Sequence, residues 1–187
     1  MRKILMVLLL VLTCGEAYAQ KFMALPTGVR DADNIDNSFL VLSFPDKTPK
    51  ELYEATNKFI QMSYVNPNNA IRGNIEGKYI KVTTYASNAI LLQKGVFGEP
   101  YYADLRLLLS FEFREGRMKF DIEQINFLYN KSESFDYIRV AALSWGIFDK
   151  KGMPVKDFNV QLENYLNTYV NSLISFINKE FTVDDDW

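Results

Sequence analysis

The segment DLRLLLSFEFREGRMKFDIEQINFLY, residues 104–129, decides the fold. Its apolar residues alternate with polar ones on both sides of Glu115-Gly116, which is the period of a β-strand with one buried face. A two-residue turn there sets three apolar pairs opposite one another: Phe113 with Met118, Phe111 with Phe120, and Leu109 with Ile122. The other face sets Glu112 opposite Lys119, so the charges support the same register. The segment predicts a long β-hairpin.

The alternation changes phase near the end of this segment. After Glu123 the apolar residues continue at Ile125 and Phe127, on odd-numbered positions. A bulge at Glu123-Gln124 would return Ile125 to the core opposite Leu107.

Residues 1–19 have the pattern of a cleaved signal peptide. A positively charged start precedes a short apolar run, Ile4 to Thr13, and Ala17-Tyr18-Ala19 is a small-x-small cleavage site. We expect cleavage after Ala19, so that the mature chain starts at Gln20. The expected location is periplasmic or extracellular.

Cys14 leaves a second reading of the leader open. An acylated cysteine would make the chain a lipoprotein with a lipid anchor. Thr13 stands where such sites carry Gly, Ala or Ser, so the sequence favours the cleaved form. No later apolar run is long enough for a transmembrane helix, and we expect none in the mature chain.

The composition excludes several classes of chemistry. The chain has no histidine, and cleavage after Ala19 removes its only cysteine. Ser-His-Asp and Cys-His catalysis and histidine-based metal sites are therefore excluded, and we expect no catalytic, metal or cofactor site. The mature chain keeps 19 basic and 22 acidic residues, so it lacks the basic excess that nucleic-acid binding requires.

The mature chain divides into three parts. Residues 20–37 show no clear period and contain Pro26 and Gly28, which predicts an extended N-terminal arm with a turn. Residues 38–181 are expected to form a single α+β domain. Residues 182–187 form an acidic C-terminal tail.

The domain begins with a strand and a helix. Ser38 to Phe44 is continuously apolar at its centre, which favours a central strand. Thr48 and Glu51 form a capping box around Pro49, which begins a helix. Its predicted buried stripe is Leu52, Ala55, Phe59 and Met62, and its predicted outer ion pair is Glu54 with Lys58.

Ala70 to Tyr85 predicts a second hairpin. A two-residue turn at Glu76-Gly77 would set Gly73 against Ile80 and Ile71 against Val82. Gly73 inside a strand indicates a bulge or a close approach of another backbone. The following Ala86 to Pro100 fits a short strand or a helical turn followed by a loop. Ile90 to Phe97, as an exposed flap, would be a candidate contact surface.

The last third of the chain predicts helices. Phe135 to Phe148 carries a helical stripe, although Tyr137 to Ala142 could instead extend the sheet. Asp157 to Lys179 is the longest predicted helix, and its Tyr165 and Tyr169 fit core packing better than an aromatic binding strip. Its expected outward residues are Asn159, Glu163, Asn167 and Asn171.

Three stretches resemble a family of bacterial exported proteins of unknown function with a TATA-binding-protein-like (TBP-like) fold. They are the strand-to-helix segment Phe44–Phe59, the glycine-containing strand Ile71–Ile75 and the hairpin strand Arg117–Ile122. The resemblance spans about Phe39 to Phe127. It implies an antiparallel sheet of about five strands with helices packed on one face. The family has no assigned activity or catalytic residues, and the fold name does not imply DNA binding.

The sequence favours an exported, non-enzymatic binding or interaction module with an unknown protein or small ligand as its partner. A homodimer formed through an edge strand is also possible. The candidate contact residues are Tyr101, Tyr102 and Trp145, because aromatic residues often anchor interfaces.

A hydrolase with paired carboxylates is the alternative function. Its candidate residues are Asp104, Glu112, Asp121 and Glu123. Asp121 and Glu123 share a strand face, about 7 Å apart, which is within the range of an acid–base pair. An exposed pair lacks the burial that raises the pKa of a carboxylic acid.

Intact-mass measurement of the exported protein distinguishes the two readings of the leader. We expect a mature mass that begins at Gln20. A mass that begins at a lipid-modified Cys14 would contradict cleavage after Ala19.

Overall fold

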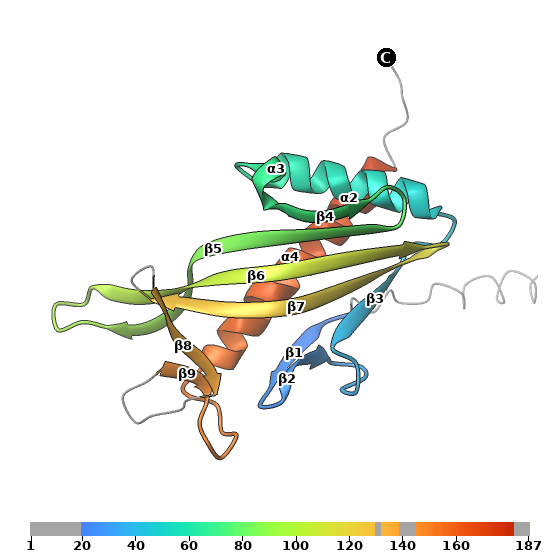
Figure 1. Ribbon diagram of the computed structural model, residues 1–187. Coiled ribbons are helices and arrows are strands. Elements are labelled where there is room, and N and C mark those ends of the chain that lie inside the picture. Colours follow the sequence, from blue (N-terminus) through green and yellow to red (C-terminus); the bar gives the residue numbers. More distant parts are fainter. Residues whose placement is uncertain (1–19, 130–131, 139–144, 182–187) are drawn as a thin grey trace, which may run out of the picture.

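The computed structural model describes residues 20–129, 132–138 and 145–181. A sheet lies across the molecule, and two long helices pack on one of its faces (Figure 1). The elements, in chain order, are β1 (Phe22–Leu25), β2 (Gly28–Asp31), β3 (Phe39–Ser43), α2 (Pro49–Ser63), α3 (Pro67–Ala70), β4 (Ile71–Ile75), β5 (Tyr79–Lys94), β6 (Pro100–Arg114), β7 (Arg117–Tyr129), β8 (Ser132–Ile138), β9 (Trp145–Phe148) and α4 (Phe158–Glu180).

The hairpin of β6 and β7 has the predicted register. Phe113 pairs with Met118, Phe111 with Phe120, and Leu109 with Ile122. The pairing then slips by one residue, so that Leu107 lies opposite Ile125, which confirms the predicted bulge. At the turn Gly116 has a φ of 67°, a conformation that favours glycine.

Five antiparallel strands, in the order β4-β5-β6-β7-β3, form the main sheet. With helices on one face, this confirms the predicted α+β fold class. One detail differs, because among the described strands β3 pairs only with β7, and its buried residues alternate along the strand. It is therefore an edge strand and not the predicted central one, and its apolar outer residue Val41 lies on the uncovered face.

β8 and β9 replace the helix predicted over Phe135 to Phe148. β8 pairs antiparallel with the end of β7, and β9 pairs parallel with β8. Tyr137 lies on β8, and its ring centroid is 6.5 Å from that of Phe127 and 5.6 Å from that of Phe148. Pairing with the long β7 thus outweighs a helical stripe whose middle, residues 139–144, lies outside the described residues.

The hairpin of β4 and β5 is confirmed, with a changed turn. Ile71 lies opposite Val82 as predicted, and the register slips at Gly73. Ile75 pairs with Tyr79, so the loop has three residues and Gly73 faces Lys81 rather than Ile80. The ambiguous Ala86 to Pro100 segment continues β5 to Lys94, and β5 and β6 project together beyond the rest of the sheet (Figure 1).

Helix α2 begins with the predicted capping box between Thr48 and Glu51. Leu52, Ala55 and Phe59 are buried, but Met62 is exposed. Lys58 pairs with Glu180 of α4 and not with Glu54, which pairs with Lys50. Because Met62 is exposed, the buried stripe of α2 ends about one turn before the helix ends at Ser63.

The predicted N-terminal arm is instead the hairpin of β1 and β2, packed against α4. The Asn167 amide accepts a hydrogen bond from the Phe22 N–H at 2.8 Å and donates one to the Phe22 C=O at 3.0 Å. Glu163 accepts the Ala24 N–H at 2.9 Å. Glu163 and Asn167 were predicted to face solvent, but they satisfy the backbone along the edge of β1.

Aromatic rings join the sheet to α4. Phe120 of β7 stacks on Phe111 of β6, with ring centroids 5.1 Å apart, and on Tyr169 of α4 at 5.9 Å. Phe22 meets Phe120 edge-on at 5.6 Å. One ring therefore contacts the main hairpin, the N-terminal hairpin and the long helix.

We expect Asn167→Ala to lower the free energy of unfolding by about 1–3 kcal/mol, because the buried edge of β1 loses two hydrogen-bond partners. Asn171→Ala is the matched control, since Asn171 is exposed on the same helix and the change in helix propensity is the same. Urea denaturation of both variants gives the comparison. Equal stabilities would show that the Asn167 contacts contribute nothing.

Candidate functional site

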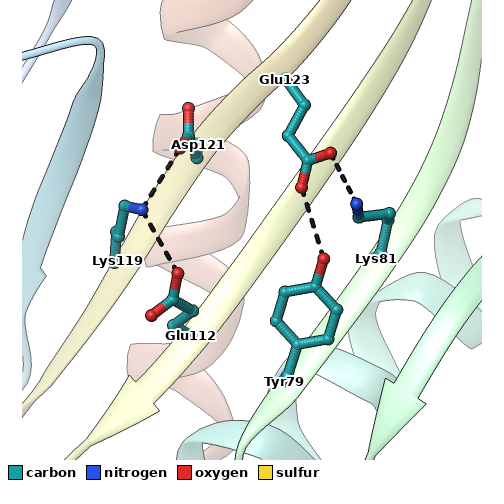
Figure 2. Close-up of polar contacts among 6 residues, drawn as sticks. All are labelled: Tyr79, Lys81, Glu112, Lys119, Asp121 and Glu123. Carbon is teal, nitrogen blue, oxygen red and sulfur yellow. Dashed lines mark hydrogen bonds and ion pairs between the residues drawn. The ribbon is translucent and has the colours of Figure 1, made fainter.

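The sheet face opposite the helices carries a network of ion pairs (Figure 2). Lys119 lies 3.3 Å from both Glu112 and Asp121. Across β6, Lys81 of β5 contacts Glu123 of β7 at 2.6 Å, and the Tyr79 hydroxyl of β5 donates to Glu123 at 3.3 Å. The cross-strand pair of Glu112 and Lys119 is confirmed.

The four carboxylates considered for hydrolysis each have a cation, hydroxyl or amide partner. Asp104 accepts hydrogen bonds from the Tyr85 hydroxyl and from the Asn88 N–H. Partial burial alone would raise the pKa of Glu123, but hydrogen bonds from Lys81 and Ser110 and the Lys81 charge hold that pKa below its ordinary value. Glu123 is thus kept ionised, which does not suit a general acid.

A shallow hollow on this face contains only one of the four carboxylates, Glu112. Its other lining residues are Phe39, Val41, Arg114, Arg117 and Lys119. The hollow therefore does not place a second candidate carboxylate opposite Glu112, as a paired-carboxylate site would require.

A larger groove lies between the end of α2, the middle of β5 and α4. We call it the tyrosine groove, and its volume is about 770 Å³. Its thirteen lining residues include no charged side chain: Phe59, Ser63, Tyr64, Val65, Asn66, Thr83, Thr84, Tyr85, Ser87, Tyr165, Thr168, Tyr169 and Ser172. The volume is within the range of ligand pockets.

Hydroxyl groups converge in this groove. The Tyr64 and Tyr169 hydroxyls lie 2.9 Å apart and form a hydrogen bond. The Thr84 hydroxyl faces both Tyr64 and Tyr165. The Tyr169 ring is held in the core by its stacking on Phe120 and its edge contact with Phe59 at 5.7 Å. The groove thus presents hydroxyls whose rings are fixed by packing, which reduces the entropy lost when a ligand binds.

Burial changes the acidity of these phenols. It raises the pKa of Tyr64 and Tyr165, and the nearby Thr84 hydroxyl offsets part of the rise in both. The pKa of Tyr169 is raised well above its ordinary value by burial and then by the neighbouring Tyr64. All three phenols are therefore neutral hydrogen-bonding groups near neutral pH.

The residues predicted to contact a partner lie elsewhere. Tyr101 and Tyr102 are half-buried on β6, opposite Gln93 and Leu91 of β5, close to the loop that closes the projecting hairpin. Trp145 begins β9, and its side chain lies outside the described part of the structure. None of the three lines the tyrosine groove.

Part of the tyrosine groove could have been predicted from sequence patterns. Tyr165 and Tyr169 are one helical turn apart, and buried tyrosines usually need a hydrogen-bond partner. Tyr64 and Thr84 carry no such signal, because they reach the groove only through the packing of α2 on the sheet.

The described residues contain neither a candidate metal-ligand cluster nor a candidate membrane-spanning helix. Within those ranges, no three acidic, cysteine or histidine side chains gather as a metal site would require. None of the helices there combines the length and apolar character needed to cross a membrane.

The fold is similar to those of two solved structures. A DUF4468 family protein from Bacteroides ovatus matches with a TM-score of 0.50 and 11% identity, over 80% of this chain and 87% of that chain. A TBP-like protein from Parabacteroides distasonis matches with a TM-score of 0.46 and 16% identity, over 75% and 88% of the two chains. No family model and no curated protein matches the sequence. The first match shows that this chain shares its fold with a bacterial DUF4468 family protein, in agreement with the predicted resemblance to a bacterial family of unknown function.

The raised phenol pKa values predict a loss of stability in alkali. Above about pH 10 the phenols of the unfolded chain release protons, whereas the buried phenols of the folded chain retain theirs. We expect the free energy of unfolding to fall as the pH rises above that value, and Tyr169→Phe to reduce the slope. Urea denaturation at a series of pH values measures it. Identical slopes for Tyr169→Phe and the unchanged protein would contradict the raised pKa of the Tyr169 phenol in the folded chain.

Proposed function

We propose that the chain is an exported, non-enzymatic binding module whose binding site is the tyrosine groove. The observation that carries this proposal is the convergence of neutral hydroxyls from α2, β5 and α4 in a groove without charged lining residues. A few fixed polar groups among aromatic walls are typical of sites that bind and orient a ligand. The ligand we propose is uncharged.

The ion pairs on the opposite face support a binding module more than a hydrolase. Carboxylate chemistry of the glycosidase type needs one carboxyl that holds a proton and a second nearby that does not. Glu123 instead contacts Lys81 and Tyr79, while Lys119 bridges Glu112 and Asp121. These contacts give the outer face the character of a solvated, charge-paired sheet surface.

Export is part of the proposal and rests on the leader sequence. The run Ile4 to Thr13 and the site Ala17-Tyr18-Ala19 favour a periplasmic or extracellular protein released by cleavage. The alternative is envelope attachment through an acylated Cys14, in which case the groove would act at a membrane surface.

Ligand-observed NMR tests the binding site. The probes are a panel of uncharged amides, short uncharged peptides and neutral mono- and disaccharides, added to the mature chain. We expect at least one class to bind, and the double variant Tyr64→Phe/Tyr165→Phe to weaken that binding roughly five- to tenfold, because two hydroxyls are lost while both rings remain.

Tyr102→Phe is the matched control, since it removes a phenol hydroxyl that does not line the tyrosine groove. Binding that is equally strong in the double variant would place the site elsewhere. Absence of binding by every probe would overturn the proposal. Turnover of a glycoside panel that is lost in Glu123→Gln would favour the hydrolase instead.

A further inference from the structure

We propose that the ligand of the tyrosine groove is an uncharged, extended peptide segment that adds a strand to the open edge of β5. This inference rests on the proposed function, because it assigns a ligand class to the same site. It is carried by the direction of the backbone groups of β5, by the end of β4, and by the composition of the groove walls.

The register of β5 and β6 determines which backbone groups of β5 face the edge. The Phe113 N–H donates to the Lys78 C=O at 3.0 Å, and the pairing continues without a slip from Tyr79 opposite Glu112 to Ala86 opposite Leu105. Alternate residues of an antiparallel strand direct their N–H and C=O groups to opposite sides. The even-numbered residues of this stretch therefore bond to β6, and the N–H and C=O of Tyr85 face away from it.

β4 covers only the first part of this edge. Its pairing with β5 ends where Ile71 lies opposite Val82. Within the described residues no strand covers Tyr85 on that side, and the stretch from Thr83 to Ser87 contributes four lining residues to the tyrosine groove. Unpaired backbone groups beside a groove are the starting point for recognition by strand addition.

Further along β5 the edge is closed by a side chain. The Leu91 N–H donates to the Gln161 side chain of α4 at 2.7 Å, as the Phe22 N–H does to Asn167. Helix α4 thus covers the edges of β1 and distal β5 with the side chains of Glu163, Asn167 and Gln161. At the tyrosine groove the same helix presents Tyr165 and Tyr169, which leave the edge of β5 accessible.

The groove walls favour a peptide with apolar and neutral side chains. Val65 is fully exposed at the end of α2, and Tyr85 is half exposed on β5. Tyrosine, serine, threonine and asparagine make up eleven of the thirteen lining residues. Such surfaces combine rigid aromatic contacts with adaptable hydrogen bonding, as antibody paratopes do, and the absence of lining charge disfavours a charged segment.

The test uses a phage-displayed library of random octapeptides built from uncharged residues, selected on the mature chain. We expect selected peptides to bind Tyr85→Pro roughly tenfold more weakly than Tyr85→Ala. Both variants lose the phenol ring, but only proline also removes the edge N–H. Proline is tolerated on strand edges whose N–H faces solvent, so the β5–β6 ladder should persist.

A second measurement does not depend on the folding of Tyr85→Pro. Selected peptides are synthesised in two phases. In one phase the odd-numbered residues carry N-methyl groups, and in the other phase the even-numbered residues carry them. Strand addition requires that one phase abolish binding and the other leave it nearly unchanged, because only alternate amides of a strand face its neighbour. Equal effects of the two phases, or equal binding to the Ala and Pro variants, would overturn the inference.

The saccharide probes separate failure of this inference from failure of the proposed function. If no peptide is selected but a neutral saccharide binds and depends on Tyr64 and Tyr165, the tyrosine groove is a binding site and the peptide inference is wrong. If neither class binds, both are wrong.

Discussion

The stacking of Phe120 between Phe111 and Tyr169 is the contact on which the rest of the structure depends. The first ring pair lies across the two strands of the main hairpin and fixes their register. The second joins that hairpin to α4, and the edge contact with Phe22 adds the N-terminal hairpin. Three separate parts of the chain are therefore positioned against one side chain. The described residues contain no cysteine, and burial of these aromatic rings supplies much of the stability of the domain.

The same stack connects the core to the tyrosine groove. The Tyr169 ring belongs to the stack, and its hydroxyl belongs to the groove, where it meets Tyr64. The position of that hydroxyl is consequently set by the packing of β6, β7 and α4. A groove of this kind changes little in shape when it is filled, because moving its polar groups would require a change in the core.

The sequence predicted the parts of the fold in which local pattern and tertiary packing agree. Alternation gave the β6–β7 register and its bulge, and the capping box gave the start of α2. Prediction from local pattern was wrong where pairing with a distant segment decides the secondary structure. The helical stripe of Phe135 to Phe148 was outweighed by pairing with β7, and the aperiodic N-terminus became a hairpin because α4 offers Glu163 and Asn167 to its edge.

The candidate site could be predicted only in part for the same reason. A helical period separates apolar from polar positions, but it does not say whether a polar residue faces water or the backbone of another strand. Asn167 and Asn171 have the same place in the predicted pattern, yet only Asn167 meets β1. Tyr165 and Tyr169 fit a core stripe, and nothing local indicates that their hydroxyls emerge beside Tyr64 and Thr84.

The existence of the groove follows from a difference in strand length. β5 has sixteen residues, whereas β4 has five, so β5 continues well beyond the pairing with its neighbour. The chain before β4 cannot extend that pairing as a strand, because Pro67 begins the short helix α3, and this helix leads directly into Ile71 of β4. The end of α2 and the tyrosines of α4 stand beside the uncovered stretch of β5 without pairing with it. The proline and the length of β5 thus leave hydrogen-bonding backbone next to aromatic walls, and that combination is the physical basis for expecting a strand-like ligand there.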